Sequence, residues 1–454
     1  MADPHLLPPL PPPPPVPETL LQIEPITPLL NFTQNNNNYN QNNHRRETLS
    51  TQDDDLDQTL QKLETFLCFL GFSQSSVCSF LFSWAAFGLV GVALPVIILE
   101  LSNCPGCEKF QIKNSELDIV ASQACLAAVS LICLSHNMRK YGVKKFLFVD
   151  RYSGQMTRLS RQYIAQIKDS LRLLVLWSLP CFILKVAREV IRISYVKHES
   201  WLSSSAILFG LILSWSYVST ISLSASVIFH MVCNLQVIHF EDYGKLLERE
   251  SDVLVFIEEH IRLRYNLSKI SHRFRIFLVL QFIVVTASQF MTLFQVTGYS
   301  GIITVINGGD FVVSSIVQVV GIILSLHAAT RISHRAQAIA CLASRWHALA
   351  TCNATANGSS DPSGYPTNAL QVSYSESDLE SFDYIAVPTN TQLASYMTSY
   401  HRRQAFVLYL QNNPGGITIF GWTVDRGLLN TIFFIELTLV TFLLGKTLVF
   451  SSSS

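Results

Sequence analysis

Residues 205–229 read SAILFGLILSWSYVSTISLSASVIF. This stretch contains no Asp, Glu, Lys or Arg. A helix of about 20 mostly apolar residues crosses the roughly 30 Å hydrocarbon core of a bilayer, so the stretch is long enough to span it. A helix at the surface of a soluble domain normally carries a charged or strongly polar face, and this one has none. The stretch therefore predicts a transmembrane helix.

Six further segments have the same character, and together they predict the fold class. The backbone N–H and C=O groups of a chain in lipid must be paired within the chain, which a helix achieves by itself. We therefore expect an all-α polytopic membrane protein with seven transmembrane helices. The predicted spans are residues 79–101, 116–136, 171–187, 205–229, 275–297, 311–329 and 428–450.

The composition of the whole chain supports this class. Hydrophobic residues make up 49 % of the 454 residues and charged residues only 14 %, against about 25 % charged residues in soluble domains. The 32 Lys and Arg residues balance the 32 Asp and Glu residues. A zero net charge argues against a polybasic nucleic-acid binder.

The distribution of Lys and Arg predicts the orientation, because these residues are retained on the cytoplasmic side of membranes. With the N-terminus inside, 23 Lys and Arg residues lie in cytoplasmic segments and 5 in external ones. We therefore expect a cytoplasmic N-terminus and an external C-terminus. This orientation is the reverse of that in G-protein-coupled receptors.

Several segments outside the predicted spans differ in composition. Residues 1–52 are rich in Pro and Asn and predict a disordered cytoplasmic tail, and residues 351–378 predict a disordered cytoplasmic insertion. The membrane domain is expected over residues 53–450, with helical extensions on the cytoplasmic side. One of these extensions is a separate helix over residues 396–410.

The sequence offers little for catalysis, and we expect neither an enzyme nor a bound cofactor or metal. Gly445, Lys446 and Thr447 look like the end of a phosphate-binding loop, but Val440 stands where that loop requires its first glycine. His327 and His334 have no Cys or carboxylate at a spacing that completes a zinc site.

Two cysteines occur in the short external loop Cys104-Pro105-Gly106-Cys107. On an oxidising face such a pair can form a small disulfide, and the same spacing also suits a redox-active pair. A disulfide that staples the loop is the favoured interpretation.

Small polar residues are frequent within the predicted spans, and they allow two interpretations. They commonly let helices pack closely and form hydrogen bonds with one another. The alternative is an outward-open pocket for a small, mostly uncharged ligand, with aromatic walls and a few hydrogen-bonding groups. The candidate pocket residues are Phe182, Trp215, Tyr217, Ser314 and Gln318.

The last predicted span carries a narrow polar stripe. At about 100° per residue, five of its residues fall within an arc of about 100°: Asn430, Thr431, Thr438, Thr441 and Gly445. Such a stripe suits the wall of a weakly selective pore or a seam between helices. Glu436 lies on the opposite side, and it is the only acidic residue that the predicted spans place deep in the membrane. This position favours contact between Glu436 and neighbouring helices over pore lining.

The sequence before and within this span also resembles a known family. Gly421 to Leu429 read GWTVDRGLL, and Thr438 follows. This pattern looks like the C-terminal signature of insect gustatory receptors, although Leu439, Gly445 and Lys446 depart from it. Residues 53–450, including Cys104-Pro105-Gly106-Cys107 and the segment LLNTIF over 428–433, more closely resemble the plant gustatory-receptor-like membrane family, a domain of unknown function.

The resemblance implies a homotetrameric, ligand-gated, nonselective cation channel in the plasma membrane, opened by an unknown small molecule. The last helix would line a central pore, and residues 396–410 would form a cytoplasmic anchor helix. Lys446 near the outer mouth would disfavour cations unless its side chain points away from the axis. The alternative function is a noncatalytic membrane scaffold or signalling protein without a pore. A secondary transporter is less favoured, because the sequence shows no internal repeat.

Overall fold

The computed structural model describes residues 55–74, 76–101, 113–148, 155–195, 201–247, 252–298, 305–356 and 391–449, all within one compact unit of the chain, Thr51–Ser454. About 93 % of these residues are helical. The predicted tail over residues 1–52 and the cysteines Cys104 and Cys107 lie outside the described residues. The predicted disordered insertion lies outside them too, except for its first six residues, 351–356. Those six residues are helical, so the expectation of disorder is wrong there.

Six helices of the described residues are long and apolar enough to cross a membrane, which makes the chain a plausible multi-pass membrane protein. The first comprises α2 (Val77–Ala86), a π-helical segment η1 (Phe87–Ala93) and α3 (Leu94–Leu101). The other five are α4 (Lys113–Leu147), α5 (Gln155–Tyr195), α6 (Trp201–Leu247), α7 (Val253–Gly298) and α8 (Val305–Ala356).

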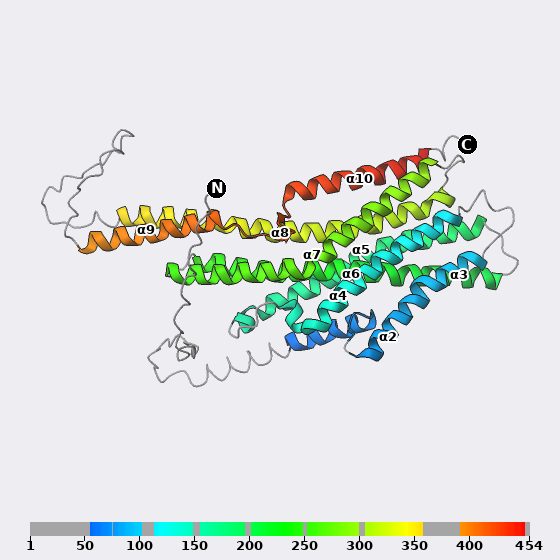
Figure 1. The fold of residues 1–454 in the computed structure, drawn as a ribbon, viewed down its shortest axis with the longest axis horizontal. Coiled ribbons are helices and arrows are strands. Elements are labelled where there is room, and N and C mark those ends of the chain that lie inside the picture. The colour runs from blue at the N-terminus through cyan, green and yellow to red at the C-terminus, as the bar shows by residue number, and fades with distance from the viewer. Residues whose placement is uncertain are drawn as a thin grey trace, which may run out of the picture. The chain divides into compact units, whose positions relative to one another are not determined.

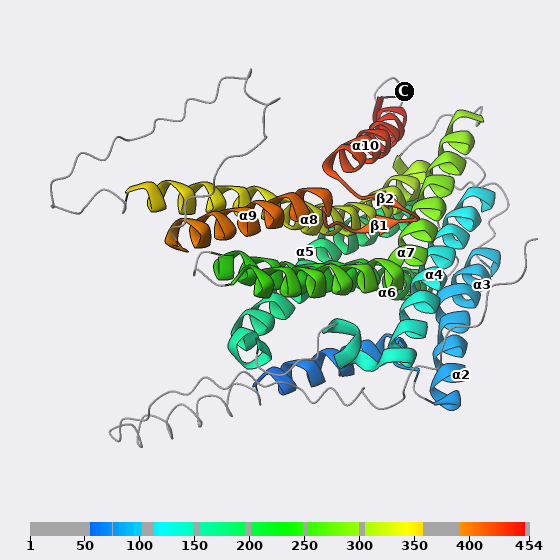
Figure 2. The same ribbon diagram turned by 60° about the vertical axis from the view of Figure 1, so that its left-hand side comes forward.

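The seventh predicted span corresponds to α10 (Arg426–Val449), which is not among these six helices. It follows α9 (Thr391–Asn412) and a two-stranded hairpin of β1 (Thr418–Ile419) and β2 (Trp422–Thr423). Figure 2 shows the hairpin between the end of α9 and the start of α10. The seven-helix count and the orientation therefore remain predictions.

The long helices extend well beyond the predicted spans. α6, α7 and α8 have 47, 46 and 52 residues, which corresponds to about 70 Å or more at 1.5 Å per residue. This is roughly twice the thickness of a bilayer core. Figure 1 shows α9 lying along the C-terminal part of α8.

Aromatic side chains hold α9 against these extensions. The ring of Phe406 in α9 stacks on Phe256 of α7 with a centroid separation of 5.7 Å. Trp346 of α8 meets both rings edge-on, at 5.5 Å from Phe256 and 6.3 Å from Phe406. Edge-to-face and offset aromatic pairs add to the free energy gained by burial, so this part of the main hydrophobic core holds α7, α8 and α9 together.

The helix over residues 55–69 also packs onto the bundle. Its leucines recur every three or four residues, which places them on one face of a helix. Leu56, Leu60, Leu63 and Leu67 are all buried in the main hydrophobic core. The amphipathic pattern therefore explains why this helix docks rather than remaining in solvent.

Candidate functional site

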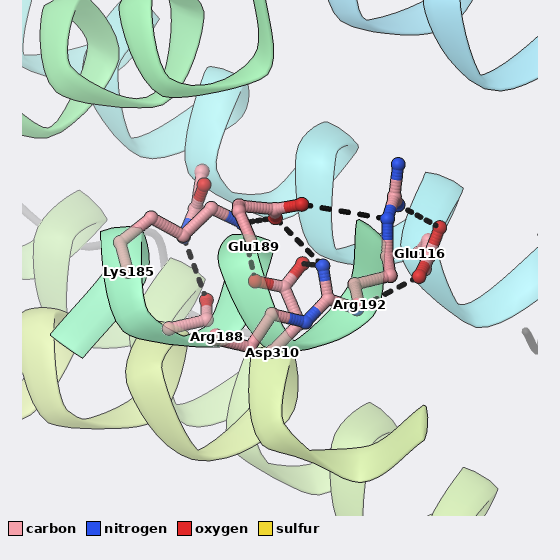
Figure 3. Close-up of polar contacts among 8 residues, drawn as sticks. Glu116, Lys185, Arg188, Glu189, Arg192 and Asp310 are labelled. Atoms are coloured by element: carbon pink, nitrogen blue, oxygen red, sulfur yellow. Dashed lines mark hydrogen bonds and ion pairs between the residues drawn. The ribbon is translucent and has the colours of Figure 1, made fainter. Parts of the chain in front are cut away.

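Four charged residues of α5 lie on one face of that helix. Lys185, Arg188, Glu189 and Arg192 are spaced at i, i+3, i+4 and i+7, which brings them to the same side over two turns. That side of α5 faces α4 and α8, and there each charge meets an opposite charge (Figure 3).

Glu189 is at the centre of this cluster. Its carboxylate is 2.9 Å from Lys185 Nζ, 2.7 Å from Arg188 Nη1 and 3.4 Å from Arg192 Nε. One acidic side chain therefore contacts all three cations of the α5 face.

Two further carboxylates come from neighbouring helices. Glu116 lies in the first turn of α4. Its carboxylate accepts hydrogen bonds from Arg188 Nη2 at 2.8 Å and from Arg192 Nη1 at 3.2 Å. Asp310 of α8 accepts a hydrogen bond from Lys185 Nζ, and its other oxygen is 4.0 Å from Arg188 Nη1. The ion cluster, defined as Glu116, Lys185, Arg188, Glu189, Arg192 and Asp310, thus joins α4, α5 and α8.

The ion cluster is buried and electrically balanced. Its six residues are between 1 % and 6 % exposed, and three positive charges face three negative ones. Removing charges from water is costly, and mutual attraction offsets that cost only where geometry is good and hydrogen bonds are many. Loss of a single member would leave a net charge in the interior, so we expect the helix arrangement to depend on all six.

The ion cluster corrects one expectation from the sequence. The third span was expected to end at residue 187 and leave Arg188 and Arg192 in a loop, but α5 continues as a helix to Tyr195. Glu116, Glu189 and Asp310 are buried between helices, as Glu436 is. A charge ends a membrane span when it is unpaired, whereas these charges are paired. The i, i+3, i+4, i+7 spacing of Lys185, Arg188, Glu189 and Arg192 was the feature of the sequence that indicates a shared helix face.

A small cavity of about 30 Å³ lies beside the ion cluster. Besides the six charged residues, Gln123, Ser214 and Trp215 line it. Gln123 Nε2 donates a hydrogen bond to Ser314 Oγ at 3.0 Å, which connects α4 to α8 beside the cavity. The cavity has room for water and small ions rather than for a drug-sized molecule.

Two chains of amide hydrogen bonds continue between the helices. Gln281 of α7 donates to Ser226 Oγ of α6 at 3.0 Å and accepts from Ser325 Oγ of α8 at 3.1 Å. Gln289 Nε2 lies 3.4 Å from Gln318 Oε1. Buried amides that bond across helices tie them together, so Gln281, Gln289 and Gln318 contribute to helix packing here.

The five candidate pocket residues fall into separate places. Ser314 and Gln318 take part in hydrogen bonds between helices, and Tyr217 packs against the main core. Phe182 and Trp215 line a second, larger cavity between α5 and α6. The structure therefore does not bring all five into one pocket, although Trp215 lines both cavities.

The polar stripe of α10 lies on the exposed side of that helix. Asn430, Thr431, Thr438 and Thr441 are exposed, and Gly445 is half-buried. The three threonine hydroxyls donate to carbonyls four residues earlier at 2.6 to 3.0 Å. Phe434, on the same side, is 63 % exposed.

Glu436 occupies the opposite side of α10 and is buried. In that direction α10 contacts α7 and α8. Among the described residues, Glu436 Oε2 has no hydrogen-bond partner. Glu436 thus faces neighbouring helices, and the polar stripe faces away from them.

The described residues hold no group of three or more His, Cys, Asp or Glu side chains placed to bind a metal ion. Their cysteines are all free.

Comparison with known proteins yields one family. A family model described as "Protein of unknown function (DUF3537)" matches residues 58–435, which is most of the chain. No curated protein and no solved structure matches it.

Proposed function

The chain belongs to the DUF3537 family of proteins of unknown function, and from its own geometry we propose that it is a subunit of a ligand-gated, nonselective cation channel. In this proposal the chain has seven transmembrane helices, a cytoplasmic N-terminus and an external C-terminus. Four copies assemble in the plasma membrane, and α10 of each copy lines a shared central pore.

The observation that carries this proposal is the arrangement of α10. One side of the helix, with Ile432 and Glu436, is buried against the rest of the chain. The other side presents Asn430, Thr438 and Thr441 outward. Exposed polar groups gain nothing from lipid, whereas they stabilise water and hydrated ions along a pore. A polar side that points away from its own bundle therefore suits a pore built from several copies.

The exposed side of α10 also carries apolar residues that suit such an assembly. Phe434 is on the same side as the threonines, and Ile435 and Phe442 flank it and are exposed. Apolar residues beside a polar stripe provide contacts between copies, and an aromatic ring within the stripe provides a constriction that excludes water.

The resemblance to gustatory receptors supports the same proposal. In that family the helix before the pore helix anchors the cytoplasmic end, and α9 has the corresponding position in this chain. Ligand binding is assigned to the cavities bordered by Trp215, which lie between α5 and its neighbours. A membrane scaffold without a pore is the competing function, and it requires no water along α10.

Cysteine accessibility distinguishes these functions without a known ligand. Thr438→Cys and Thr441→Cys variants are expressed in cells and exposed to a charged, membrane-impermeant thiol reagent from outside. Ile435→Cys is the matched control, because Ile435 is exposed on α10 beside the stripe rather than within it. We expect the two stripe positions to react several-fold faster than the control and above the background of native cysteines.

The proposal also predicts an electrical signal. Reagent attached at position 438 or 441 should change the membrane current of cells that express the variant. Equal reactivity at all three positions, together with a purified protein that remains monomeric, would contradict the channel and favour the scaffold.

A further inference from the structure

The cavity between α5 and α6 has a volume of about 320 Å³. Among its lining residues are Leu174, Leu179 and Phe182 of α5 and Leu223 of α6, and none of its lining residues is charged. The cavity is therefore an apolar space that suits a neutral molecule.

Four of the residues that line this cavity carry a buried polar side-chain atom without a hydrogen-bond partner in the described part of the chain. Trp215 Nε1 and the hydroxyl oxygens of Ser178, Ser216 and Ser219 make no hydrogen bond among the described residues. Trp215 is 7 % exposed and Ser219 is 6 % exposed, so neither side chain lies at a surface where bulk water would provide a hydrogen bond. A buried donor without a partner costs free energy, and most such groups in native proteins are satisfied.

The position of these groups limits what can satisfy them. Ser178 and Ser219 lie near the middle of the predicted spans 171–187 and 205–229. Water is scarce at that depth of a bilayer, so a bound molecule is the natural partner. The indole N–H of Trp215 only donates, so that molecule must carry an acceptor oxygen.

The cavity opens sideways rather than toward the centre of the helix bundle. Leu179 and Phe182 line it and are exposed on the outer side of α5, as is Val175. In a membrane this side of α5 faces lipid. The route into the cavity is therefore through the bilayer.

We propose that the cavity binds a neutral amphiphile that enters from the bilayer, with its hydroxyl or carbonyl oxygen at Trp215 Nε1 and Ser219 Oγ and its apolar part against Leu179 and Phe182. Since Trp215 also lines the small cavity beside the ion cluster, the bound oxygen lies one side chain away from that cluster. The proposal concerns binding only and does not depend on ion conduction.

Photolabelling of the full-length protein in phosphatidylcholine vesicles tests this proposal. The probe is a dodecanol that carries a diazirine. The reference compound is a dodecane that carries the same diazirine and has no hydroxyl. We expect the alcohol to label the peptides of α5 and α6 that line the cavity roughly three- to tenfold more than the alkane, as one hydrogen bond implies. Unlabelled dodecanol should compete, and dodecane should not.

Variants of the same protein identify the groups involved. Trp215→Phe and Ser219→Ala should each bring alcohol labelling down toward the level of the alkane. Ser224→Ala is the matched control, because Ser224 is also a buried serine of α6 with an unpartnered hydroxyl but does not line the cavity. Labelling of this control should equal that of the wild type.

The comparison of the two probes on the wild-type protein needs no variant, so the test survives a variant that fails to fold. Equal labelling by alcohol and alkane would overturn the proposal, because it would show a surface that only contacts bulk lipid. Preferential alcohol labelling that Trp215→Phe and Ser219→Ala leave unchanged in folded protein would overturn the assigned hydrogen bonds.

Discussion

Replacing Glu189 by Gln removes the carboxylate that contacts all three cations of the ion cluster. The wild-type cluster holds three charges of each sign, and the Glu189→Gln variant holds three positive and two negative charges in a site where no residue exceeds 6 % exposure. Breaking a buried ion pair by removing one partner costs about 3–5 kcal/mol of folding free energy. We expect Glu189→Gln to lose stability in this range.

The chain contains a control ion pair at the surface. Lys144 Nζ and Asp57 Oδ1 are 2.9 Å apart, the same separation as Lys185 Nζ and Glu189 Oε1. Their side chains are 62 % and 66 % exposed. Exposed pairs contribute at most about 1 kcal/mol, so Asp57→Asn should change stability by no more than that.

Unfolding of the purified full-length protein in detergent measures both variants. The mole fraction of denaturing detergent at the midpoint should fall clearly for Glu189→Gln and scarcely for Asp57→Asn. A double variant, Lys185→Met with Asp310→Leu, keeps two charges of each sign and should be more stable than Lys185→Met alone. If Glu189→Gln is no more destabilising than Asp57→Asn, water reaches the ion cluster, and its charges do not depend on one another for stability.

Three other substitutions, one of them with a control variant, test the packing and the pore. Gly415→Ala should lower the free energy of unfolding by about 1–3 kcal/mol, because a Cβ at this position would lie 2.8 Å from the Cβ of Ala336. A variant as stable as the wild type in the same unfolding assay would disprove this close approach of residue 415 to α8. Phe406→Ala should cost about 3–5 kcal/mol, because a fully buried ring is lost. Its control, Leu408→Ala on the exposed side of α9, should cost under about 0.5 kcal/mol, and similar losses for the two variants would contradict the aromatic packing of α9 on α7 and α8. Phe434→Ala should increase current per channel in patch-clamp recordings by widening the pore at its aromatic ring, and an unchanged conductance at normal surface expression would place this ring outside the pore.

The five residues of the predicted pocket separate in the structure. Phe182 and Trp215 do line one cavity, but Ser314 and Gln318 form hydrogen bonds between helices instead. Composition shows which residues can form hydrogen bonds within a membrane. Whether a given hydroxyl meets another helix or an empty space depends on the packing of all neighbouring helices.

The sequence alone determined the features that depend on local patterns. Uncharged stretches predict membrane-spanning helices because the apolar residues that bury in lipid are contiguous in the chain. Rotation of 100° per residue places Glu436 opposite the threonine stripe of α10, and the structure has Glu436 buried and the threonines exposed.

Only the tertiary structure decided which charges are paired. Arg188 meets Glu116 across 72 residues of chain, and Lys185 meets Asp310 across 125. The spacing of the α5 charges places them on one face of a helix, but it does not show which distant carboxylates that face meets. The difference arises because the free energy of a buried charge is set by the partners that distant helices bring within reach, and those partners exist only once the helices have packed.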